Sequence, residues 1–229
     1  MTLDMGNTDK LAIYKQELER QKIVLLPPEI NESEVEFSVA QLDAPEPPAG
    51  DDDEVEDVPV GAIRYALAAV KGVGRAAMAD LVAEREANGR FGDSFEVASR
   101  LKAHVLNRRQ LEHLAAAGAF DTLDVNRARV FDGIDQILAH AQATQRERES
   151  GQFNLLGDMN GEGAIKPQLP DRMDWIQSDK LQRELDALGF YMSAHPLDEY
   201  ATVLDRLNIV SSTEVEQTVT IQGGTAALV

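Results

Sequence analysis

The sequence LAAVKGVGRAAMADLV, residues 67 to 82, places two glycines between two apolar segments and decides the fold. Apolar residues recur at spacings of three and four in these segments, as they do on the buried face of a helix. Each segment can therefore bury one face against the other, which is the pattern of a helix-hairpin-helix motif. The residues that form the two faces are Leu67, Val70, Met78, Leu81 and Val82.

The turn of this hairpin, Gly72-Val73-Gly74, has the composition of a phosphate-binding loop. A glycine turn that leads into a helix exposes unpaired N–H groups at the positive end of the helix dipole, and these suit a phosphate. Lys71 and Arg75 add positive charge on either side. The plainer interpretation is a helix C-cap followed by a new helix, but the apolar framing and the two cations together favour phosphate contact. Such contact supplies affinity and position without reading base sequence.

Length and composition limit what the hairpin can belong to. A chain of 229 residues suits one or two domains. It contains no cysteine, which excludes disulfides, thiolate zinc sites and cysteine nucleophiles and favours a reducing compartment. The chain shows no secretory leader and no apolar run long enough to cross a bilayer, so we expect a soluble, cytoplasmic protein.

The net charge of −18 opposes binding to nucleic acid unless the charge is unevenly placed. Residues 61–129 hold eleven Lys and Arg against eight Asp and Glu, a local balance of +3, so the rest of the chain carries −21. Residues 40–60 alone contain eight acidic residues, four prolines and no basic residue. This composition predicts a disordered loop. The alternative, an acidic tether that mimics DNA and competes for the basic face, is supported by charge alone.

Short periodic segments surround the acidic stretch. A helix over 9–21 and a strand-like run over 22–26 precede it. Segments 36–39 and 62–65 alternate polar and apolar residues and are predicted to pair as a β-hairpin.

The helices that follow are marked by their end signals. Asn88-Gly89 is predicted to end the helix that follows the first turn. Asp93 or Ser94 can cap a short helix over 95–101.

Helix, glycine turn and helix recur further along the chain. Asn107 can cap a helix over 108–117, Gly118 follows, and a long helix is predicted from about Asn126. Because this second turn has one glycine where the first has two, we expect it to serve packing rather than phosphate binding. The buried face of the long helix is predicted to hold Val130, Ile134, Ile137, Leu138 and Ala141.

The segment GQFNLLG, residues 151–157, places three large apolar residues between glycines in a polar neighbourhood. It either folds back onto its own core or is presented to a partner, and the spacing leaves both open. A helix over 179–188 is predicted to end at Gly189, and the chain is expected to stop within a domain because its last residues resemble a strand without a sheet. The four histidines, His195 among them, lack metal-ligand spacing, so we interpret His195 as a packed or surface residue and predict no metal site.

Five motifs in the same order make nearly the whole chain resemble the alpha subunit of bacterial DNA polymerase III. They are LLPPEIN (25–31), AVKGVG (69–74), NRRQLEHLAAAGAFD (107–121), GQFNLLG (151–157) and LGFYMSAHPL (188–197).

The resemblance implies a mainly α fold. Its central part would be a tandem helix-hairpin-helix domain over 61–150 with a small β-hairpin at its start. The acidic insert 40–60 is longer than the resemblance leads us to expect between the paired strands. The remaining parts implied are the end of the fingers domain (1–39), a clamp-binding segment and linker (151–170), a helical connector (171–210) and the start of an OB-fold, truncated (211–229).

The resemblance also implies two binding sites. Lys71, Gly72, Val73, Gly74 and Arg75 would grip double-stranded DNA behind the polymerase active site.

The GQFNLLG segment is similar to the family's internal motif for the sliding clamp, the beta subunit. The glutamine amide would hydrogen-bond at the rim of a clamp pocket while two leucines bury in its groove. The residues of this motif are Gln152, Phe153, Asn154, Leu155 and Leu156.

The family's polymerase carboxylates, with the Mg²⁺ they hold, belong to a palm domain upstream of the segment that this chain resembles. We therefore expect part of a DNA-directed DNA polymerase that works with other replicase subunits, with no catalytic residue and no cofactor in this chain. Two alternatives remain: a free-standing DNA-binding scaffold, and a lyase-type repair domain in which Lys71 forms a Schiff base.

Overall fold

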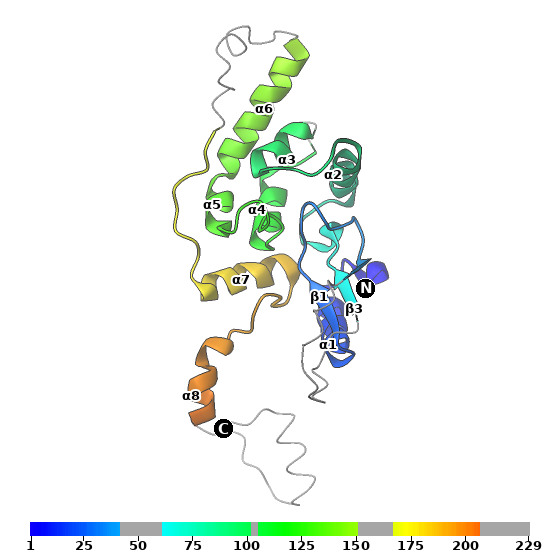
Figure 1. Ribbon diagram of the computed structural model, residues 1–229, viewed down its shortest axis with the longest axis vertical. Helices are drawn as coiled ribbons and strands as arrows, with labels where there is room; N and C mark the ends of the chain where they lie inside the picture. The colour runs from blue at the N-terminus through cyan, green and yellow to red at the C-terminus, as the bar shows by residue number, and fades with distance from the viewer. Residues whose placement is uncertain (42–60, 102–104, 151–166, 207–229) are drawn as a thin grey trace, which may run out of the picture. The chain divides into compact units, whose positions relative to one another are not determined.

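The computed structural model describes residues 1–41, 61–101, 105–150 and 167–206. Helices dominate the described chain (Figure 1), which confirms the predicted mainly α class. The chain divides into two compact units, residues 1–193 and 194–229. The helices of the first unit are η1 (Thr2–Asp4), α1 (Thr8–Arg20), η2 (Leu67–Ala69), α2 (Arg75–Asn88), α3 (Ser94–Arg100), α4 (Arg108–Ala116), α5 (Arg127–Asp132), α6 (Ile134–Ser150) and α7 (Gln177–Leu188), where η marks a 3-10 helix. The second unit contains η3 (Asp198–Tyr200) and α8 (Ala201–Arg206).

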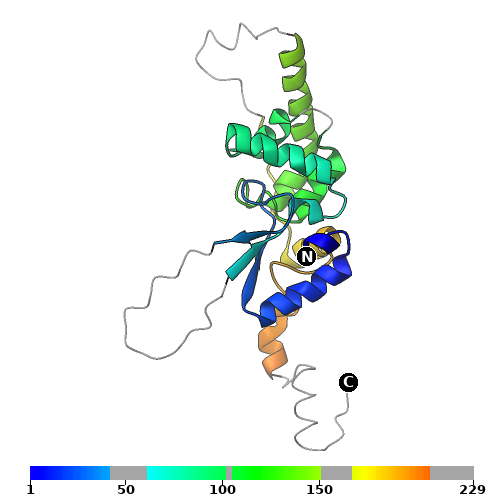
Figure 2. The ribbon, with the colours of Figure 1, turned by 90° about the vertical axis from the view of Figure 1, so that its right-hand side faces the viewer.

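Three short strands form one sheet beside α1 (Figure 2). They are β1 (Ile23–Leu26), β2 (Ser38–Ala40) and β3 (Gly61–Arg64), in the order β1-β3-β2. β2 pairs antiparallel with β3, which confirms the predicted hairpin. β1 joins β3 in parallel, a pairing that the sequence pattern did not indicate.

The segment before the glycine turn differs from the prediction. It is a single 3-10 turn, η2, instead of an α-helical segment. The Tyr65 N–H extends the sheet contact by donating to the Leu26 carbonyl, and the Lys71 N–H donates to the Ala187 carbonyl of α7. Because both ends are fixed in non-helical pairing, only one helical turn fits between them.

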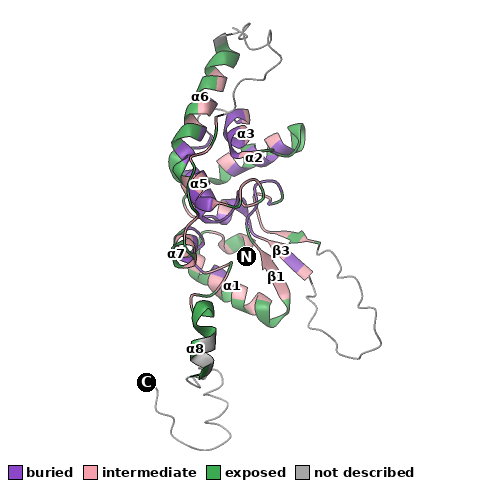
Figure 3. Ribbon diagram, turned by 60° about the vertical axis from the view of Figure 1, so that its left-hand side comes forward, coloured by how far each residue is buried: buried purple, intermediate pink, exposed green. Residues whose placement is uncertain are grey.

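The hairpin nevertheless buries the residues that its spacing predicted. Leu67, Val70, Met78, Leu81 and Val82 are all at most 6% exposed. They join a core to which α3, α4 and α5 also contribute (Figure 3). Burying each large aliphatic side chain of this kind contributes about 1.5–3 kcal/mol relative to exposure. Apolar burial thus fixes the position of the turn between η2 and α2.

The long helix predicted from about Asn126 is interrupted at Gly133 into α5 and α6. A side chain at Gly133 would collide with Leu169 and Pro170, whose segment crosses the helix there. The sequence spacing of α5 and α6 contains no sign of this crossing, which comes from residues far along the chain. The predicted face remains: Val130, Ile134, Ile137 and Ala141 are buried, and Leu138 is half-buried.

The helix ends follow the capping signals. Asn107 caps α4 in a full capping box with Gln110, and Asp93 caps α3. Gly89 and Gly189 end α2 and α7 with φ of +84° and +91°.

Several predicted features lie outside the described residues. They are the acidic insert beyond residue 41, residues 151–166 with the GQFNLLG segment, and the C-terminal strand. Within the described ranges, no helix combines the length and the apolar character needed to cross a membrane.

Candidate nucleic-acid interface

The Gly72 turn presents an open helix N-terminus. Gly72 has φ of +73° and is exposed, and Gly74 occupies the N-cap of α2 in extended backbone. The glycine supplies no side-chain cap. By contrast, a side-chain oxygen caps each of α1, α3, α4 and α5, from Asn7, Asp93, Asn107 and Asn126 respectively.

The first backbone bond of α2 runs from the Met78 N–H to the Gly74 carbonyl, at 3.1 Å. The N–H groups of Arg75, Ala76 and Ala77 therefore lack a partner within the helix. Such groups, at the positive end of a 14-residue helix, form an anion site without any side chain. Val73 is 8% exposed and packs into the core, which holds this site in place.

The fold places α4 directly against the turn. A side chain at Gly72 would lie 3.3 Å from Arg109 Nε and 3.5 Å from His113 Cε1, and one at Gly74 would lie 3.4 Å from Gln110 Nε2. Arg109 therefore joins the residues that the sequence assigned to the site. Arg109 and His113 stand four apart on α4, so they share a face, but the spacing does not tell which turn that face meets.

Ion pairing separates the cations near the turn from the rest. Most described Lys and Arg residues between 61 and 129 hold a carboxylate. The exceptions among the described residues are Lys71 and Arg109, both beside Gly72, and Arg64, which donates to the Pro27 carbonyl at 3.5 Å. The paired residues are Arg75, Arg85, Arg90, Arg100, Arg108, Arg127 and Arg129.

Arg75, which the sequence places beside Lys71 in the site, forms an ion pair with Glu36. Both side chains are substantially exposed, at 60% and 43%. An exposed pair of this kind is worth at most about 1 kcal/mol, so a phosphate can compete for the guanidinium. Lys71 and Arg109 need no such exchange.

The second glycine turn is closed. Gly118 is buried with φ of +82°, and a side chain there would lie 2.6 Å from Arg127 Cζ and 2.9 Å from Asp121 Oδ2. Arg127 also pairs with Glu184 of α7 at 3.3 Å, and both of these side chains are almost fully buried. This buried ion-pair cluster packs directly against Gly118.

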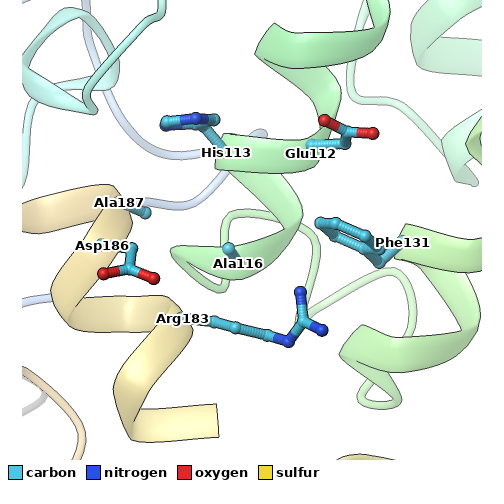
Figure 4. Close-up of a pocket in the computed structure, with 7 residues that line it drawn as sticks. All are labelled: Glu112, His113, Ala116, Phe131, Arg183, Asp186 and Ala187. Atoms are coloured by element: carbon cyan, nitrogen blue, oxygen red, sulfur yellow. The ribbon is translucent and has the colours of Figure 1, made fainter. Parts of the chain in front are cut away.

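A cavity of about 170 Å³ lies between α4, α5 and α7 (Figure 4). Arg183 lines this cavity and stacks on Phe131 and Trp175, with its Cζ atom 4.8 and 4.2 Å from the respective ring centroids. The other lining residues are Glu112, His113, Ala116, Asp186 and Ala187. Acidic and basic groups are mixed in this lining, so the cavity has no single charge preference.

The remaining predicted site residues, Gln152 to Leu156, lie outside the described part of the chain. Among the residues that the structure does describe, no group of three or more His, Cys, Asp or Glu is placed to hold a metal ion. The described site chemistry therefore concentrates at the Gly72 turn.

The chain matches one known motif family and several known proteins. The family model of the helix-hairpin-helix motif matches residues 22–130. The DNA polymerase III subunit alpha of Caulobacter vibrioides is 38% identical over 93% of this chain and 17% of the relative. The corresponding subunit of Neisseria meningitidis serogroup B is 35% identical over 90% of this chain and 17% of the relative, and that of Vibrio cholerae is 29% identical over 97% and 18%. The chain thus spans less than a fifth of the length of these curated relatives.

Proposed function

Because this chain is homologous to one segment of the DNA polymerase III alpha subunits, we propose that it binds the backbone of duplex DNA through the Gly72 turn. The open N-terminus of α2 would receive one phosphate, and Lys71 and Arg109 would neutralise it and a neighbouring phosphate. Backbone N–H groups and cations contact phosphates irrespective of the bases, so this binding would be independent of sequence.

One observation carries the proposal. The turn combines a positive φ at Gly72, an uncapped helix of 14 residues and two cations, Lys71 and Arg109, that hold no carboxylate among the described residues. The second turn, at Gly118, is not open in this way, because the ion-paired side chains of Arg127 and Asp121 lie against it. The same motif is thus open for an anion at one position and closed at the other.

The test is duplex binding as a function of salt concentration for the Lys71→Ala/Arg109→Ala double variant. The slope of log affinity against log salt should fall by up to about two, since each lost phosphate contact removes about 0.9 from it. The loss should be equal on unrelated duplex sequences. The matched control is Arg64→Ala, which removes an unpaired arginine on β3 and should leave the slope unchanged. An unaltered slope in the double variant would place the DNA surface elsewhere.

We also propose that the chain acts as part of a DNA-directed DNA polymerase, positioning DNA while other parts of that enzyme transfer nucleotides. The support is the homology to DNA polymerase III alpha subunits over about nine-tenths of this chain. In this arrangement the chain alone should not incorporate nucleotides on a primed template. Incorporation by the purified chain, abolished by Lys71→Ala/Arg109→Ala, would overturn this division of labour.

A second proposed contact is with the sliding clamp, through Gln152, Leu155 and Leu156. It is supported by the glutamine and paired leucines of the sequence and by the same homology. Two buried leucines could supply a few kcal/mol before ordering costs, so we expect the isolated motif to bind no more tightly than about micromolar.

Calorimetry with the cognate clamp should show binding that Leu155→Ala/Leu156→Ala abolishes and Gln152→Ala weakens. Lys71→Ala, which alters only the DNA site, is the control and should bind the clamp normally. Normal clamp binding by the double leucine variant would remove this contact from the proposal.

A further inference from the structure

His113 lies on α4, beside the Gly72 turn. A side chain at Gly72 would lie 3.5 Å from its Cε1 and 3.6 Å from its Nδ1, so the imidazole ring borders the backbone of the turn. Figure 4 shows the ring projecting from α4 on the side away from Glu112 and Phe131. A charge placed on the open end of α2 would therefore act on this ring at short range.

The groups around His113 hold it in the neutral form. Burial lowers the pKa of the His113 imidazole most, and the positive charge of Arg109 lowers it further, with a smaller effect from Lys71. The Lys71 backbone and the Glu112 carboxylate act in the opposite direction but do not outweigh them. Nδ1 is buried and forms no hydrogen bond with the described residues. From α7, Arg183 and Asp186 line the same cavity.

A phosphate bound at the turn would reverse this balance. It would neutralise the field of Arg109 and Lys71 at the ring and add a negative charge that favours the imidazolium.

We propose that His113 takes up a proton when the Gly72 turn binds a DNA phosphate, an inference that rests on the proposed function. Proton uptake means that DNA binding tightens as the pH falls. The bound form has the higher pKa, so the extra affinity is absent well above it and complete below the pKa of the free protein. A difference of one pKa unit between the two forms corresponds to about tenfold tighter binding at the acidic limit. The protonation state of the histidine would thus change how tightly this turn binds DNA.

The experiment is calorimetric titration of the full chain with a short DNA duplex near pH 6.5, in two buffers that differ in ionisation enthalpy. The difference between the observed enthalpies gives the number of protons taken up. We expect a clear fraction of one proton for the unaltered chain and for His140→Gln, and none for His113→Gln. His140 is the matched control because it lies on α6 and packs edge-on against Phe95, with ring centroids 5.6 Å apart.

A second readout does not require a variant. The Cε1–H nuclear magnetic resonance signal of His113 should titrate at higher pH when duplex is bound than when it is absent. Equal midpoints, or undiminished proton uptake in His113→Gln, would overturn the inference. If duplex binding depends on Lys71 and Arg109 but takes up no proton, only this inference fails. If no duplex binds, the proposed function fails with it.

Discussion

Gly72 must meet two requirements at once. Its backbone has a φ of +73°, and Arg109 and His113 lie close to the place that a side chain would occupy. A glycine is the residue that satisfies both, because it has no Cβ to clash in the left-handed region. Glycine at this position thus allows both the backbone conformation of the turn and the close packing of α4 against it.

We therefore expect Gly72→Ala to weaken duplex binding and to lower the free energy of unfolding by about 1 kcal/mol. The alanine would strain the turn and displace Arg109 from it. Fluorescence anisotropy with a labelled duplex and urea denaturation measure the two effects.

Gly89→Ala is the matched control. Gly89 has φ of +84°, but the space where a side chain would go is empty, and the residue lies at the opposite end of α2. This variant should also lose stability, because its backbone conformation is one that glycine alone adopts readily, but it should keep its DNA affinity. Equal loss of binding in both variants would show that the Gly72 effect comes from reduced stability alone.

At the scale of the elements, one ion pair at the site joins the segment before β2 to the first residue of α2. Glu36 neutralises Arg75 there, at the edge of the open helix end. Removing the carboxylate should free the guanidinium for phosphate and remove a negative charge that repels DNA.

Glu36→Gln should accordingly bind duplex DNA a few-fold more tightly, with a salt slope steeper by about one. The control is Glu32→Gln. Glu32 lies on the same loop as Glu36 and pairs with Arg90, which follows α2, so this variant changes the net charge by the same amount. The salt-dependent binding assay distinguishes the two. Equal tightening in both variants would attribute the effect to net charge instead of to Arg75.

The elements also show what the sequence could and could not predict. The helix ends at Asp93, Asn107 and Gly189 could be predicted from the sequence, because capping depends on residues close in the chain. The close approach of Leu169 and Pro170 to Gly133 could not, because these residues lie 36 or more positions further along the chain.

The site shows the same division. The glycine turn and Lys71 follow from composition and spacing. The participation of Arg109, and the engagement of Arg75 by Glu36, follow only from how α4 and the segment before β2 dock on the turn. Sequence periodicity gives the face of each helix but not the partner that this face meets.

For the molecule as a whole, the net charge opposes DNA binding. The chain carries a net charge of −18, and most described arginines near the hairpin are paired with acids. Attraction to DNA must therefore come from the small region around Gly72. Such a site predicts weak binding that depends strongly on salt, of the kind that benefits from tethering to a larger assembly.

The most direct measurement is an amide chemical-shift titration of the isotope-labelled chain with a short duplex. Binding at the open helix end should perturb the signals of residues 72–77 and of Arg109, in the same way for unrelated duplex sequences. Signals around Gly118, where the Arg127–Asp121 ion pair fills the turn, should stay unchanged. Perturbations centred on Gly118, or none at residues 72–77 while the duplex binds, would contradict the assignment of DNA binding to the Gly72 turn.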